Sequence, residues 1–96
     1  MIRIIAKNFI KPSEISKAEP LFRELVAASR KDQGCLEYRL HKDDAEPGLY
    51  VFIEEWADKD SHAKHDASEH FKRIIPQIGA LTAKPADVLF LHDELK

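Results

Sequence analysis

The segment Leu49–Trp56, with the sequence LYVFIEEW, is the strongest β-strand pattern in the chain and decides the fold. Alternate residues of a strand point to opposite faces of its sheet. The two sets are Leu49, Val51, Ile53 and Glu55 on one face and Tyr50, Phe52, Glu54 and Trp56 on the other. Both sets are largely apolar, whereas a sheet with one face in water shows one polar set. The sequence therefore predicts that both faces of this strand are covered.

Two strands and one helix are predicted before this segment. Ile2–Ile10 alternates in part and is typical of a strand. Residues 14–32 place apolar side chains at helical spacing, and Cys35–His41 again favours a strand. Residues 43–48 (DDAEPG) have the composition of a turn.

The start and end of the predicted helix have specific signals. Ser16 and Glu19 have the spacing of a capping box, which would place Pro20 in the first turn. A start near Ser13 would instead leave Pro20 inside the helix and distort it. Gly34 is a plausible terminator of this helix.

Two short helices and a last strand are predicted after the segment. Asp58 is a suitable N-cap for a helix that ends near residues 64–66, and Ser68 for a second one. Pro76 is expected to kink or shorten the second helix. Asp87–Asp93 (DVLFLHD) favours the last strand.

The resulting order is βαββαβ, which predicts a ferredoxin-like α+β fold with an antiparallel four-stranded sheet. We expect one domain over residues 1–96. Helices in this arrangement cover one face of the sheet. The simplest cover for the other face is a second copy of the chain, so we expect a homodimer through the sheet faces.

Composition narrows the possible partners and the location. The formal net charge is −2 and the pI is about 6.2, with Lys and Arg spread along the chain, which argues against nucleic acid. No segment is apolar over the length that a bilayer requires. The single cysteine, Cys35, excludes an internal disulfide, and no signal peptide is visible. We therefore expect a cytoplasmic protein that does not enter membranes.

Three of the five histidines follow the only tryptophan. Trp56 ends the strongest strand, and His62, His65 and His70 lie within the next fourteen residues, followed by Phe71. The unperturbed pKa of histidine lies close to neutral, so such residues exchange protons under ordinary conditions. An indole at a strand end with imidazoles on the next helices suggests the wall of a pocket.

The chain resembles the antibiotic biosynthesis monooxygenase domain family over nearly its whole length. The matching segments are IAKNFI, GCLEYRLH, VFIEEWADKDSHAKH and SEHF. Within them lies the combination Glu54, Trp56, Asp58, His65, Ser68, His70 and Phe71. The resemblance implies small proteins that form a dimeric α/β barrel. It implies cofactor-free monooxygenases acting on quinols and anthrones, relatives that isomerise a phosphorylated signalling sugar, and haem-degrading relatives.

The haem-degrading branch fits poorly. Asn8 matches an asparagine of that branch in the first strand, but His65 stands where that branch has a pocket tryptophan. Its iron-ligand histidine corresponds to a position near Ile75. A chain without the axial ligand cannot hold iron in the same way.

A cofactor-free oxygenase needs a base, donors for a developing oxyanion and an apolar cavity. We predict His65 as the base, assisted by His70, which requires a turn to bring the two together. Asn8 and Trp56 could donate to a substrate oxygen. Phe52 and Phe71 could line the cavity. Each of these residues also has a purely structural interpretation, as polar strand end, helix cap or core.

Three functions stay open at this point. The first is a cofactor-free enzyme that oxidises a small aromatic substrate with O2. The second is an isomerase of a small phosphorylated carbonyl compound, with Arg39 or Lys7 as phosphate ligands. The third is a non-catalytic binding or stress-response module. A metal site of His62, His65 and His70 lacks an obvious carboxylate ligand, so we predict neither metal nor other cofactor.

Overall fold

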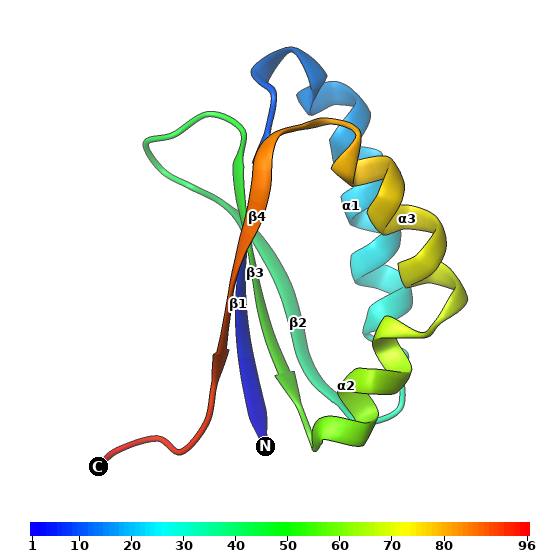
Figure 1. Ribbon diagram of the computed structural model, residues 1–96, viewed down its shortest axis with the longest axis vertical. Coiled ribbons are helices and arrows are strands. Elements are labelled where there is room, and N and C mark those ends of the chain that lie inside the picture. Colours follow the sequence, from blue (N-terminus) through cyan, green and yellow to red (C-terminus); the bar gives the residue numbers. More distant parts are fainter.

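The computed structural model describes residues 1–96 and consists of one sheet and one layer of helices (Figure 1). The elements in chain order are β1 (Ile2–Ile10), the 3-10 turn η1 (Pro12–Glu14), α1 (Ile15–Ser29), β2 (Cys35–Lys42), β3 (Leu49–Trp56), α2 (Lys59–Asp66), α3 (Glu69–Gly79) and β4 (Thr82–Leu91). Neighbouring strands pair antiparallel in the order β2-β3-β1-β4. The predicted ferredoxin-like α+β fold is confirmed.

The helices lie on one side of the sheet, and the core lies between the two layers (Figure 1). The side chains of β3 that face the helices are all buried: Tyr50, Phe52, Glu54 and Trp56. Phe22 and Leu25 of α1 and Ile74 and Ile78 of α3 pack from the opposite side. Burying one large apolar side chain stabilises a fold by roughly 1.5–3 kcal/mol, so these residues determine how the layers pack.

The other face of the sheet is not covered by any part of this chain. The strand register places the following apolar residues on it: Ile5, Phe9, Leu49, Val51, Ile53, Leu89 and Leu91. None of them is fully buried, and Leu89 is 51% exposed. The chain itself therefore covers only one of the two apolar faces of β3, the face toward the helices. None of the helices combines the length and apolar character needed to cross a membrane.

Helix α1 differs from the prediction at both ends. It begins at Ile15 and ends at Ser29, so Ser16 lies inside it and the predicted capping box is wrong. The Glu19 carboxylate instead accepts a hydrogen bond of 2.5 Å from the Tyr50 hydroxyl. Pro20 lies inside the helix, as the alternative start predicted. The tertiary contact with β3 gives Glu19 a partner that the local capping pattern could not reveal.

Gly34 does not terminate α1, because the helix ends earlier and Arg30 is its C-cap. Gly34 has a φ of +80°, which favours glycine, and its carbonyl accepts a hydrogen bond of 2.8 Å from the Ala57 amide. A Cβ at this position would lie 2.0 Å from the Ser61 hydroxyl oxygen. Gly34 thus allows the start of β2 to approach the first turn of α2.

Strand β4 is longer than predicted at its beginning and shorter at its end. It runs over Thr82–Leu91 rather than Asp87–Asp93. The observed strand includes Pro85, although proline cannot donate to a ladder. β4 is an edge strand, and its register with β1 shifts between Lys7 and Phe9, opposite Asp87 and Lys84. An irregularity at a sheet edge accommodates proline without loss of the strand.

The predicted caps of the two short helices are confirmed. The Asp58 side chain accepts from the Ser61 amide at 2.8 Å, and the Ser68 side chain accepts from the Phe71 amide at 3.3 Å. Helix α3 continues through Pro76 to Gly79, so Pro76 does not end it. These caps fix where α2 and α3 start, and His65 and His70 lie on either side of the turn between the two helices.

We expect Gly34→Ala to destabilise the fold. A non-glycine residue at a positive φ costs of order 1–3 kcal/mol, and the contact with Ser61 adds to this cost. Urea denaturation measures the loss in the free energy of unfolding. Gly79→Ala is the matched control, because a Cβ there meets nothing within 4 Å. Equal stabilities of the two variants would contradict this account of Gly34.

Candidate active site

Asp32, His65 and His70 form a hydrogen-bonded cluster. One carboxylate oxygen of Asp32, Oδ2, lies 2.8 Å from Nδ1 of His65 and 2.8 Å from Nε2 of His70. Asp32 follows α1, His65 lies in the last turn of α2, and His70 lies in the first turn of α3. The cluster therefore joins the connection after α1 to two consecutive helices, α2 and α3, through histidines 33 and 38 residues later in the sequence.

The turn between α2 and α3 brings the two histidines together. The Ser68 hydroxyl donates to the carbonyl oxygen of His65 at 2.6 Å, and the Ser68 amide donates to the same oxygen at 3.1 Å. As the N-cap of α3, Ser68 also sets the start of the helix that carries His70. The turn that the sequence analysis required between these histidines is present, and its geometry depends on one serine.

The hydrogen bonds define which ring nitrogens carry protons. An ionised carboxylate only accepts hydrogen bonds, so each histidine donates the N–H that faces Asp32. In the neutral imidazole this leaves Nε2 of His65 and Nδ1 of His70 with a free lone pair. A proton taken up at either nitrogen would give an imidazolium held against the Asp32 charge.

His65 is buried among aromatic rings. Its ring centroid lies 4.6 Å from that of Trp56, 5.3 Å from Tyr38 and 5.1 Å from Phe71. Only 2% of its surface is exposed. Burial lowers the pKa of His65, while its hydrogen bond to Asp32 acts in the opposite direction. The neutral, proton-accepting form is therefore favoured.

Trp56 has a different hydrogen bond from the one expected. Its indole N–H donates to Oε1 of Glu54 at 3.0 Å inside the core. In this arrangement the N–H is occupied, so Trp56 contributes its ring as packing for His65. Burial raises the pKa of Glu54 to about 7, with the hydrogen bond from Trp56 opposing that shift and the charge of Asp66 adding to it.

Asn8 and Phe52 lie outside the cluster. Asn8 pairs with Tyr50 in the sheet, whereas Trp56 pairs with Ile2, six residues away along β1. At about 3.3 Å per residue this separation is about 20 Å. The ring of Phe52 is part of the core beneath α1, with its centroid 5.6 Å from Phe22. The structure thus brings together His65, His70, Trp56 and Phe71 and leaves Asn8 and Phe52 apart.

Asp32 was missed in the sequence analysis, and Glu54 was named there only within the family combination, without a role. Glu54 carried a usable signal, because it falls on the same strand face as Phe52 and Trp56, and a carboxyl on a buried face requires a partner. Asp32 carried none, since a single aspartate after a helix is ordinary in a loop. His62 stays outside the cluster, with Nε2 3.5 Å from a carboxylate oxygen of Asp66.

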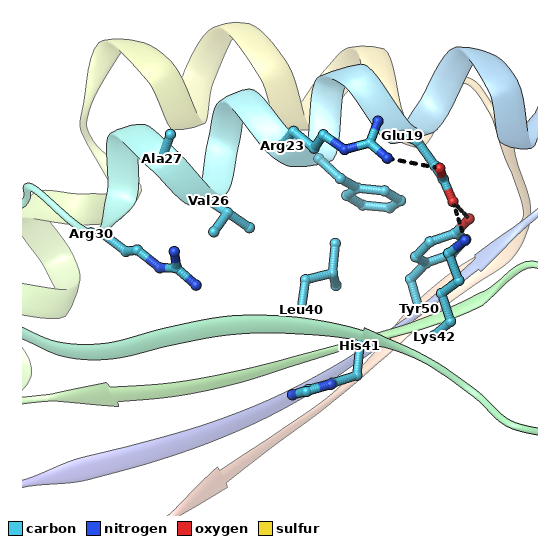
Figure 2. Close-up of a pocket in the computed structure, with 10 residues that line it drawn as sticks. Glu19, Arg23, Val26, Ala27, Arg30, Leu40, His41, Lys42 and Tyr50 are labelled. Carbon is cyan, nitrogen blue, oxygen red and sulfur yellow. Dashed lines mark hydrogen bonds and ion pairs between the residues drawn. The ribbon is translucent and has the colours of Figure 1, made fainter.

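A groove lies between α1 and strands β2 and β3 (Figure 2). Its volume is about 300 Å³. Its lining residues are Glu19, Phe22, Arg23, Val26, Ala27, Arg30, Leu40, His41, Lys42 and Tyr50. Figure 2 shows the His41 ring directed away from the groove, and the ion pairs of Glu19 close one end. No predicted site residue lines this groove.

Comparisons with known proteins agree with this fold. The family model for antibiotic biosynthesis monooxygenases matches residues 1–77. A crystal structure described as an antibiotic biosynthesis monooxygenase is 41% identical with a TM-score of 0.96, covering 99% of this chain and 100% of that one. A structure from Pseudomonas aeruginosa is 32% identical with a TM-score of 0.89, covering 98% and 94%.

A curated relative is also similar to this chain over nearly its whole length. The candidate monooxygenase YcnE of Bacillus subtilis is 27% identical over 93% of this chain and 94% of its own length. The chain therefore belongs to the antibiotic biosynthesis monooxygenase family. The family resemblance seen in the sequence is confirmed.

We expect Glu54 to make stability depend on pH. Its pKa is about 7 in the fold against 4.5 as the ordinary value, so between these limits the unfolded chain binds fewer protons than the folded one. Stability then falls as pH rises from about 4.5 to 7, by up to about 3 kcal/mol. Glu54→Gln, whose amide oxygen can still accept from Trp56, should remove this fall and be more stable than wild type at pH 8.

Urea denaturation at several pH values gives the two stability curves and their difference. Glu55→Gln is the control, because Glu55 lies on the opposite face of β3 and pairs with Arg3. That variant should keep the wild-type decline. A Glu54→Gln curve parallel to wild type would contradict the proposed burial of an ionisable carboxyl.

Proposed function

We propose that this protein is a cofactor-free monooxygenase that oxidises a small electron-rich aromatic compound, of the quinol or anthrone type, with O2. Family membership supports the reaction class. The observation that carries the proposal is the Asp32 carboxylate hydrogen-bonded to both histidines. This arrangement supplies a positioned base next to apolar aromatic rings, which is one of the three parts that the chemistry requires from the protein.

The reaction obtains its electrons from the substrate. His65 accepts a proton from the substrate, and the resulting electron-rich anion passes one electron to dioxygen. Recombination of the radical pair and loss of water convert a ring CH2 group to C=O, so one oxygen atom enters the product and the other leaves as water. No external reductant is needed for this balance.

The protein's own contribution is proton transfer in an apolar site. His65 takes the proton at Nε2, because its Nδ1–H is held by Asp32. The Asp32 charge stabilises the imidazolium that forms, and His70 shares this carboxylate and assists. Trp56 and Phe71 fix the ring and exclude water, which strengthens electrostatic interactions in the site.

A homodimer is part of the proposal. The uncovered sheet face carries seven apolar side chains of β1, β3 and β4, given above, that no segment of this chain covers. A second copy placed sheet against sheet would bury them and form the dimeric barrel that the family resemblance implies. The single cysteine, Cys35, which allows no internal disulfide, supports the cytoplasm as the proposed location.

We expect oxygen consumption with members of a panel of hydroquinones and anthrones, followed with an oxygen electrode. Removal of a general base typically costs 10²–10⁴-fold in rate, so His65→Ala should lower kcat/KM by at least about 100-fold. Asp32→Asn should lower it less, since it removes the partner of the base. Asp32→Glu should restore part of the loss by keeping the charge.

Lys72→Ala is the control for this series. Lys72 is exposed on α3, in the helix layer and not on the sheet face that we propose to bury in the dimer. Its activity should equal wild type. Turnover of a carbonyl substrate without oxygen uptake would favour the isomerase, and no turnover with any substrate would favour a binding module; either outcome refutes the oxygenase.

We expect Ile53→Lys to separate the proposed dimer into monomers. The substitution places a charge at the centre of the uncovered sheet face, where burial against a second copy would be costly. Light scattering coupled to size-exclusion chromatography measures the molar mass. Lys72→Glu, an exposed position on α3, should leave the mass unchanged. A wild-type mass of 11.0 kDa would refute the dimer.

A further inference from the structure

The geometry points to a second occupant of the histidine cluster: we propose that Asp32, His65 and His70 form a binding site for one divalent transition-metal ion of the zinc class. The three residues each offer one ligand atom, and these atoms all lie within 4.8 Å of one another. This inference goes beyond the proposed function, which uses the same residues without a metal.

The donor set fits such an ion. Two imidazole nitrogens and one carboxylate oxygen are ligands that zinc and its first-row neighbours accept, and three protein ligands leave one position for water. His65 and His70 reach the same carboxylate from different helices, so the ligands converge from separate directions. An ion with oxygen preference alone, such as Mg²⁺, would not match two imidazoles.

The spacings between the ligand atoms must change for an ion to fit. Bonds of about 2.0–2.1 Å to a tetrahedral ion place adjacent ligand atoms about 3.3 Å apart. The two spacings to Asp32 Oδ2 are each 2.8 Å, so each must open by about half an ångström. Asp32 lies outside regular secondary structure between α1 and β2, and a rotation of its side chain would change both spacings together.

The surroundings combine a fixed ligand with an access route. The His65 side chain is 2% exposed and its ring is packed by Trp56 and Phe71. The side chains of Asp32 and His70 are 19% and 16% exposed, so an ion and its water reach the cluster from their side. Ligands whose orientation is fixed by neighbouring groups lose less entropy when they bind a metal.

The structure also separates this set from the group of three histidines that the sequence suggested. His62 faces Asp66, and its ring centroid lies 6.1 Å from that of His65, with Phe90 on another side at 5.7 Å. The carboxylate that the sequence could not supply is Asp32. His62 therefore serves as a matched control, since it is a neighbouring histidine outside the cluster.

A metal ion and the two N–H protons exclude each other. The ion would bind Nδ1 of His65 and Nε2 of His70, the atoms that donate to Asp32 in this structure. Metal binding can thus be measured on the folded protein without reference to turnover. A failure of the oxygenase assay leaves the metal measurement unaffected, and the reverse also holds.

The test starts from protein that has been stripped of metal with a chelator. This protein is titrated with Zn²⁺, followed by calorimetry, and with Co²⁺, followed by visible absorption. We expect one ion per chain in wild type and in His62→Ala. His70→Ala and Asp32→Ala should each weaken binding at least tenfold. Zn²⁺ should raise the Tm of wild type and His62→Ala and leave that of His70→Ala unchanged, because only a ligand bound to the folded state stabilises it.

Circular dichroism of each variant establishes that the fold is retained, and Asp32→Glu, which keeps a carboxylate, provides a second variant that should bind. The proposal is overturned if wild type shows no saturable uptake of either ion at millimolar concentration. It is equally overturned if His62→Ala loses binding as strongly as His70→Ala, or if the folded His70→Ala variant binds as tightly as wild type.

Discussion

The two-residue periodicity of a β-strand places the side chains of β3 on opposite faces of the sheet, and the rest of the structure depends on that division. The helix-facing set, which ends in Glu54 and Trp56, is buried beneath the helices. The other set lies on the uncovered face. One strand therefore fixes the core, the wall behind His65 and the surface through which we propose that two copies associate.

The Asp32 carboxylate provides the second constraint. It accepts from residues 33 and 38 positions later in the chain, so it ties the loop after α1 to α2 and α3. A single anionic group that holds two imidazoles supports both of our proposals. With protons on the facing nitrogens it orients a base, and without them it completes a set of metal ligands. The same geometry thus allows two occupancies that cannot coexist.

Local signals predicted the elements well where they act within a few residues. The strands Ile2–Ile10 and Leu49–Trp56 have their predicted bounds, and Asp58 and Ser68 cap the helices as expected. Two of the differences share one cause. Glu19 bonds to Tyr50 rather than to a helix start, and Pro85 is tolerated because β4 is a sheet edge. In both cases a distant strand outweighed the local preference.

The sequence by itself determined the order of the elements, the two apolar faces of β3 and the two histidines on adjacent short helices, because spacing and capping are properties of neighbouring residues. Only the tertiary structure decided which side chains meet. It brought Asp32 to both histidines, gave the Trp56 N–H to Glu54 and left Asn8 about 20 Å along β1. Pairings across the fold depend on how strands align and helices pack, and one sequence contains no periodic signal for them.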